Sequence, residues 1–103
     1  MGASTYRLLN AVIATGAGTG LPMDKDKSFQ AFMTGTGALT ATVDIEGSND
    51  GGTNWVIIGS IALSGTASAK GKLENSFPWA LVRANLSAVT GTGAAVTVWA
   101  ASN

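Results

Sequence analysis

The chain has 103 residues, with six basic and six acidic side chains and neither cysteine nor histidine. Without cysteine no disulfide framework can form, which excludes a small disulfide-stapled protein. Without histidine the commonest general base and the commonest metal ligand are missing. A formal net charge of zero provides no basic field for nucleic acid or an anionic membrane surface. We therefore expect no enzyme, no cofactor, no metal, and neither nucleic acid nor membrane as a partner.

Only 12% of the residues are charged, about half of the usage typical of soluble domains. A small monomer relies on surface charge to stay apart from its neighbours, whereas a domain covered by partners does not. The composition therefore favours a protein buried in an assembly. The alternative is that Thr, Ser, Asn and Gly supply an uncharged polar surface. The length predicts one domain, residues 1–103, with a modest core.

The first third of the chain predicts two strands separated by a polar bend. Residues 5–14 are rich in apolar and β-branched side chains, which favours a strand, and the Gly-rich run 15–20 ends it. Residues 21–27 carry charges of alternating sign and predict a solvated turn. Residues 28–34 predict the next strand, and its inward face holds Phe29, Ala31 and Met33.

Residues 39–61 predict a β-hairpin. Their first part alternates apolar and polar side chains with a period of two, which is typical of a strand with one buried face. Turn-forming residues follow at 48–54, and an apolar run restarts at Trp55. Asp-Gly between two strand-like runs is among the strongest local signals for a hairpin.

Within this hairpin, Ser48, Asp50, Gly52 and Trp55 have the spacing S-x-D-x-G-x-x-W. The pattern resembles the Asp-box hairpin of sialidases and other β-propeller proteins. An aspartate can accept bonds from backbone N–H groups in the turn, and glycine tolerates a positive φ. We expect the tryptophan to attach the returning strand to the core. The resemblance implies a structural role without activity, and a chain of this length cannot supply the blades of a propeller.

The rest of the chain predicts more short strands. A strand that restarts after the hairpin breaks at residues 64–66, and residues 67–73, with Lys70 and Lys72, predict a polar edge strand. Two alternating strands follow at 79–86 and 94–101, joined by a predicted hairpin at 90–93. Thr-Gly-Thr-Gly occurs both there and at 34–37. The pattern predicts an all-β protein without significant helix, an antiparallel β-sandwich of about seven or eight short strands, jelly-roll or Ig-like.

Tryptophans and carboxylates are the remaining candidates for function. Trp55 and Trp79 begin strands and are predicted to fill the core, whereas Trp99 lies on the face opposite two inward valines. An exposed aromatic residue is typical of protein interfaces, so Trp99 is a candidate interface residue. Asp44 and Glu46 share one strand face. With Asp50 they could hold calcium, and either could pair with Arg83, but a solvated face is the favoured interpretation.

Three motifs cover most of the chain: ATGAGTGLPM near its start, TGTGALTATVDIEGSNDGGTNWVIIGSIALSG in its middle, and PWALVRANLSAVTGTGAAVTVWA near its end. With these motifs the chain resembles small β-sandwich structural proteins of tailed-bacteriophage virions, many of which resemble head decoration (cement) proteins. The charged run at residues 24–27 departs from that pattern.

The resemblance implies a non-enzymatic protein on the outer surface of the capsid, present in the host cytoplasm during assembly. It implies that the chain binds the major capsid protein and stabilises the head. From the low charge and the outward position of Trp99 we expect a homo-oligomer, a dimer or a trimer, or a chain bound to the shell, rather than a lone monomer. The alternative is a tail or baseplate component, or an adhesion module that binds a glycan of the host surface.

Overall fold

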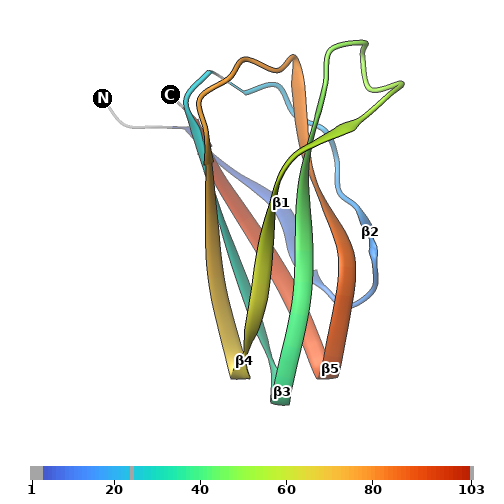
Figure 1. The fold of residues 1–103 in the computed structure, drawn as a ribbon, viewed down its shortest axis with the longest axis vertical. Helices are drawn as coiled ribbons and strands as arrows, with labels where there is room; N and C mark the ends of the chain where they lie inside the picture. Colours follow the sequence, from blue (N-terminus) through green and yellow to red (C-terminus); the bar gives the residue numbers. More distant parts are fainter. Residues whose placement is uncertain (1–3, 24, 103) are drawn as a thin grey trace.

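The computed structural model describes residues 4–23 and 25–102, and all regular elements in these ranges are β-strands (Figure 1). The strands are β1 (Ser4–Val12), β2 (Gly16–Ala17), β3 (Lys27–Ser48), β4 (Val56–Asn75) and β5 (Leu81–Ser102). They form one antiparallel sheet in the order β1-β5-β3-β4, and the short β2 also pairs with β5. The sheet does not close, so β1 and β4 are its edges. None of the described residues belongs to a helix long and apolar enough to cross a membrane.

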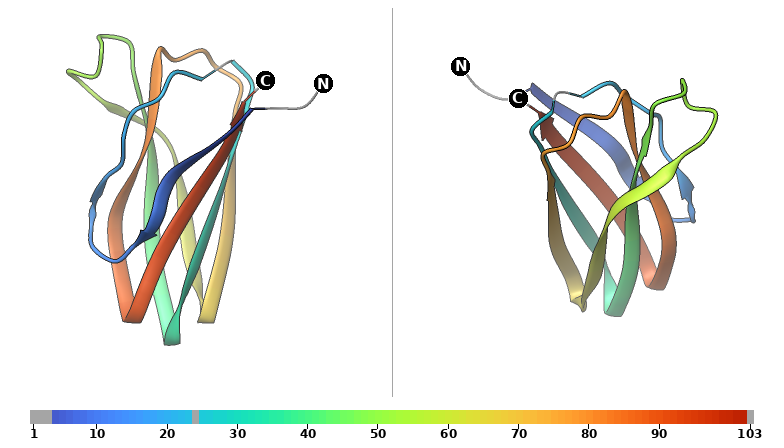
Figure 2. Two further views of the ribbon diagram at one scale, coloured as in Figure 1. Left: turned by 180° about the vertical axis from the view of Figure 1, so that it is seen from behind. Right: turned by 45° about the horizontal axis from the view of Figure 1, so that its top comes forward.

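The three long strands fold back on themselves. A fully extended strand of 22 residues, such as β3 or β5, would span about 70 Å, but the longest dimension of the molecule is 38 Å. Figures 1 and 2 show each long strand running to one end of the molecule and returning. The bends lie at residues 35–37, 65–67 and 91–93. Thr36 pairs with Thr92, and Ala38 pairs with Thr66, so the three bends are adjacent.

Folding divides the sheet into two halves that pack face to face. We name them the loop half (residues 38–48, 56–65 and 81–90) and the terminal half (residues 4–12, 27–34, 67–75 and 94–102). Each half buries alternate side chains. A Cβ placed at Gly59 in the loop half would collide with Leu73 in the terminal half. The largest fully buried hydrophobic side chains come from both halves: Phe29, Met33, Leu39, Val43, Ile45, Val82, Leu86, Val96 and Val98.

The all-β class without helix is confirmed for the described residues, but the predicted sandwich of seven or eight strands is wrong. One five-stranded sheet, with neither a jelly-roll nor an Ig-like strand order, takes its place. The Gly-Thr segments were predicted to form turns. In the structure they bend the whole sheet, and the strands stay paired with the same neighbours across the bend. The predicted hairpin at residues 90–93 is therefore a bend within β5. Positive φ angles at Gly37, Ala67 and Gly93 (72°, 65° and 66°) accommodate these bends.

Most of the predictions about single segments are confirmed. The central hairpin is present as β3 and β4, and Val96 and Val98 are buried while Trp99 lies on the opposite face. The solvated turn at residues 21–27 is wrong for Lys27, which is buried. Its ammonium group donates hydrogen bonds to the carbonyl oxygens of Lys25 and Phe77, and burial lowers its pKa although Asp26 acts in the opposite direction. Asp24, in the same turn, lies outside the described residues.

Candidate interaction surface

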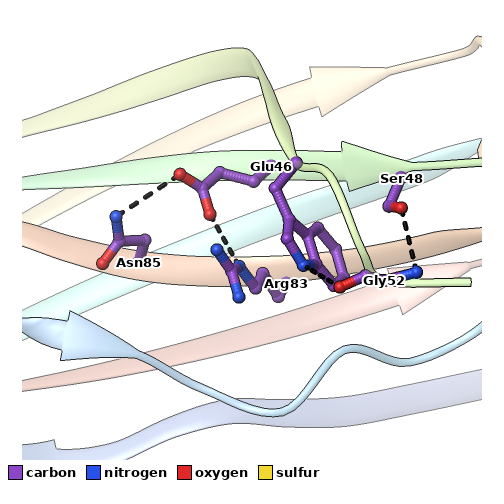
Figure 3. Close-up of polar contacts among 6 residues, drawn as sticks. Glu46, Ser48, Gly52, Arg83 and Asn85 are labelled. Carbon is purple, nitrogen blue, oxygen red and sulfur yellow. Dashed lines mark hydrogen bonds and ion pairs between the residues drawn. The ribbon is translucent and has the colours of Figure 1, made fainter. Parts of the chain in front are cut away.

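The loop between β3 and β4 is organised by two side chains of the S-x-D-x-G-x-x-W pattern. Ser48 Oγ accepts a hydrogen bond from the Gly52 N–H (3.1 Å) and donates one to Asp50 Oδ1 (2.7 Å). Asp50 Oδ1 also accepts from the Asn54 backbone N–H (3.0 Å), and Oδ2 accepts from the Asn54 side-chain amide (2.7 Å). Gly52 has a φ of 90°, as the pattern predicts. The loop is therefore a hydrogen-bonded unit, of which Figure 3 shows the bond between Ser48 and Gly52.

Asp50 is fully exposed, yet its carboxylate is strongly favoured over the acid. The backbone N–H of Asn54 contributes most, followed by the side chains of Asn54 and Ser48, and together they lower the pKa of Asp50 to about 2. Every one of these donors belongs to the loop itself. The carboxylate thus stabilises the turn.

Trp55 does not fill the core, in contrast to the prediction from its position at a strand start. Its indole lies on the outer side of the loop half, where the Arg83 guanidinium stacks 4.2 Å from the ring centroid. Gly20 covers the ring closely, and the indole N–H donates to the Gly52 carbonyl (3.0 Å). Trp79, by contrast, packs against the core and over Gly47. Trp55 therefore joins the loop to β5 and to the segment before β3.

Glu46 completes this cluster. It accepts a hydrogen bond from Arg83 Nε at 2.6 Å and a longer one from the Asn85 amide at 3.4 Å, as Figure 3 shows. The sequence left Asp44 and Glu46 as alternatives for Arg83, and the structure selects Glu46. Asp44 instead accepts from the Ser60 hydroxyl at 2.7 Å. The polar side chains of this outer face are thus paired within the chain, whereas Ile57, which pairs with Glu46 in the sheet, is 60% exposed beside them.

The carboxylates considered for calcium do not converge. Glu46 is paired with Arg83, Asp44 with Ser60, and Asp50 with its own loop. Among the described residues there is no group of three acidic, histidine or cysteine side chains placed to hold a metal ion. Each of these three carboxylates therefore stabilises the fold through a hydrogen bond or ion pair within the chain.

The outer face of the terminal half is different. We name it the terminal face; its central side chains are Arg7, Gln30, Phe32, Lys70, Lys72 and Trp99. The pairing of the strands orders them in two neighbouring rows across the half. In one row Trp99 pairs with Arg7 on one side and with Gln30 on the other, and Gln30 pairs with Lys72. In the next row Phe32 pairs with Lys70.

Two large aromatic side chains remain exposed on the terminal face. Trp99 is 43% exposed and Phe32 is 38% exposed. The Arg7 guanidinium lies 5.2 Å from the Trp99 ring centroid, but none of the carboxylates in the described part of the chain pairs with this arginine. Lys72 makes an ion pair with Glu74 at 3.4 Å in which both side chains are largely exposed. Such a pair adds little stability, so this face is not closed by the chain.

The terminal face is shallowly hollowed on both sides of β3. One hollow of about 140 Å³ lies beside Trp99 and includes Gln30, Ser28 and Thr5. A wider hollow of about 430 Å³ lies toward the β4 edge and includes Gln30, Ser28, Lys70 and Lys72. Ser28 and Gln30 border both. The face is therefore continuous and open rather than a single enclosed pocket.

The structure places Trp99 where the alternation of β5 predicted it. The neighbours of Trp99 on this face were only weakly indicated by the sequence. Phe32 breaks the inward pattern of Phe29, Ala31 and Met33, which indicates that it points outward. Nothing in the sequence indicated that Arg7 and Gln30 would lie beside Trp99, because these contacts join β1, β3 and β5 across more than 65 residues of chain.

Comparison with protein-family models, with curated protein sequences and with solved structures gives no match to this chain.

Proposed function

We propose that the chain is a non-enzymatic structural protein of a tailed-phage virion, a capsid decoration protein. In this proposal it binds the major capsid protein on the outer surface of the head, in a homo-oligomeric state, and stabilises the shell. Its sequence motifs and its low charged fraction support this proposal. A decoration protein needs no catalytic group, because it contributes interface area repeated over the symmetry of the shell.

The observation that carries the proposal is the exposure of Trp99 and Phe32 on the terminal face. A chain with so few charges leaves two aromatic rings partly exposed on one face. On the opposite outer face Trp55 is held by Arg83 and Gly20, and the exposed apolar side chain there is the aliphatic Ile57. Exposed aromatic clusters on a small protein mark interaction sites. At the centre of an interface, such rings are the side chains that contribute most to binding.

The broad side of the molecule is large enough for a stable complex. Its two longer dimensions are 38 and 33 Å, and a standard protein interface buries about 800 Å² on each partner. The terminal face alone extends over four strands. It can therefore serve as the main contact without requiring a rearrangement of the sheet.

The test is binding to virions or capsid shells that lack this protein. We expect Trp99→Ser to reduce co-sedimentation with the shells by at least about tenfold, because an aromatic anchor contributes about 2 kcal/mol or more. The circular dichroism spectrum and the unfolding midpoint should stay close to those of the wild type.

Phe77→Ser is the matched control. Phe77 is also an exposed aromatic residue, at 70%, but it lies in the connection between β4 and β5. It should bind the shells as the wild type does. Equal binding by all three proteins would contradict the proposed docking face, and unfolding of the isolated Trp99→Ser chain would show that Trp99 serves the fold.

A second candidate function is an adhesion module that binds a host glycan, as part of the tail or baseplate. It is favoured by the Gln30 amide, which lies beside Trp99 at a shallow hollow and supplies a polar partner next to an aromatic ring. Selective and tight binding of the full chain on a glycan array, lost in Trp99→Ser, would support this function over capsid decoration.

A further inference from the structure

Charge is unevenly distributed between the two outer faces although the chain is neutral. Among the described residues, the terminal face and its β4 edge carry three basic side chains, Arg7, Lys70 and Lys72, and one acidic side chain, Glu74, with Asp26 beside Glu74 at the end of the face. The outer face of the loop half carries two acidic side chains and one basic one, which is already paired. The exposed aromatic rings therefore lie on the positive side of the molecule.

From this arrangement we infer that the terminal face docks onto an acidic protein surface. Trp99 and Phe32 act as the buried anchors, and Arg7, Lys70 and Lys72 face carboxylates of the partner. The inference deepens the proposed function, on which it rests, by naming the chemistry of the surface that the chain recognises. Complementary charge at an interface accelerates encounter and rejects partners of the wrong sign.

The spacing of the basic groups requires an extended partner. Arg7 lies on β1 and Lys72 on β4, and the two strands between them separate these side chains by three strand spacings, about 14 Å. A single carboxylate or phosphate cannot contact both. A protein surface with several carboxylates can do so while it covers the two aromatic rings between them.

Nucleic acid and sulfated glycans fit the face less well. Three basic groups, spread over a face whose chain has no net charge, provide few phosphate or sulfate contacts. Two of the three side chains are lysines on an edge strand, where lysine also discourages unwanted strand pairing. If a lysine only protects the edge strand, its replacement by glutamate should not weaken binding. If it contacts the partner, the same replacement should weaken binding, so the experiment can separate edge protection from recognition.

The experiment compares Lys70→Glu with Lys25→Glu. Both variants change the net charge equally and both lysines are exposed, but Lys25 lies in the turn before β3, outside the terminal face. We would measure the dissociation constant of the full-length chain on shells of the major capsid protein and on immobilised poly-glutamate. Each series would run from about 0.1 M to about 1 M NaCl, which shortens the Debye length from about 10 to about 3 Å.

We expect Lys70→Glu to weaken binding by about tenfold at low salt, because it places like charges across the interface. Lys25→Glu should stay within about twofold of the wild type, and the difference between the variants should shrink as salt increases. Equal dissociation constants for the two variants, or binding that does not depend on salt, would overturn the inference.

The two targets separate this inference from the proposed function. Binding to poly-glutamate but not to the shells, with the expected difference between the variants, would remove the capsid as partner and retain the acidic-surface inference. Binding to neither target would overturn both. Tighter binding to heparin or to single-stranded DNA than to poly-glutamate would overturn the assignment of a protein partner.

Discussion

The molecule contains two arginine–tryptophan pairs, one on each outer face of the folded sheet, and they differ in their surroundings. Arg83 lies 4.2 Å from the Trp55 ring and is paired with Glu46, and the indole also contacts Gly20 and Gly52. Arg7 lies 5.2 Å from the Trp99 ring and has no carboxylate partner among residues 4–23 and 25–102, and Trp99 is 43% exposed. The first pair is closed within the chain and the second is open.

The comparison shows that an arginine–tryptophan contact can serve different roles, depending on its surroundings. A cation over an aromatic ring contributes more when both groups are removed from water. The pair on the loop half is enclosed by the loop and by residues before β3, so it stabilises the fold. The pair on the terminal half presents the same two groups to solvent, where a partner can enclose them. The predictions below test this distinction, from the largest expected effect to the smallest.

Removal of Glu46 should have the largest effect. Glu46→Ala leaves the Arg83 guanidinium without its carboxylate in a site where the two side chains are only 11% and 25% exposed. Because breaking a buried ion pair costs 3–5 kcal/mol and this one keeps some contact with water, we expect a loss of about 2–4 kcal/mol in the free energy of unfolding. Urea denaturation measures it.

Glu74→Ala is the control for that variant. Glu74 makes an ion pair of similar type with Lys72, but both side chains are more than two-thirds exposed. The change should stay within about 0.5 kcal/mol. Equal losses for the two variants would mean that the loop half is no more closed than the terminal half.

Trp55→Ala and Trp99→Ala compare the two rings directly. Trp55→Ala removes the stacking partner of Arg83 and a ring packed on Gly20, and we expect a loss of about 2–3 kcal/mol. Trp99→Ala should cost less, about 1 kcal/mol, since 43% of the surface of Trp99 is already exposed to water. The reverse order in thermal or urea unfolding would refute the assignment of Trp55 to the fold and Trp99 to recognition.

Gly52→Val tests the loop that positions Trp55. Gly52 has a φ of 90°, which a β-branched residue resists, and its N–H bonds to Ser48. We expect a loss of about 1–3 kcal/mol in the free energy of unfolding. An unchanged melting temperature would show that the loop adapts without this conformation.

The smallest expected effect is the pH-dependent contribution of the Asp50 carboxylate to the free energy of unfolding. Because hydrogen bonds lower the pKa of Asp50 to about 2 from 3.8, its carboxylate stabilises the folded state above the higher value. That contribution is lost as the pH falls from 3.8 toward 2. The stability difference between the wild type and Asp50→Asn should therefore narrow over this interval. A difference that stays constant with pH would contradict the role of the charge.

Much of the local structure could be predicted from the sequence, because it depends on neighbours in the chain. The alternation of β5 placed Val96, Val98 and Trp99 on the correct faces, and the turn residues at 48–54 located the hairpin. These signals follow from the two-residue period of a strand and from turn chemistry.

The folding of the sheet could not be predicted, since Thr-Gly-Thr-Gly is compatible with both a hairpin turn and a bend. A bend forms when the strand stays paired with the same neighbouring strands before and after the glycines; a hairpin turn forms when the strand pairs with itself. β3 pairs with β4 and β5 both before and after residues 35–37. This pairing depends on residues far away in the sequence, so the local motif does not reveal it. The same limit applies to Lys27, whose carbonyl partner at Phe77 lies 50 residues away.

The most direct test of the central claim is a cryo-electron microscopy map of the intact virion. We predict density for this chain on the outer surface of the head, oriented so that Trp99 and Phe32 are covered by the capsid and the loop half, with Trp55 and Arg83, faces outward. Density on the tail or baseplate would exclude capsid decoration. Density on the head with Trp99 and Phe32 exposed to solvent would contradict the assignment of the terminal face as the docking surface.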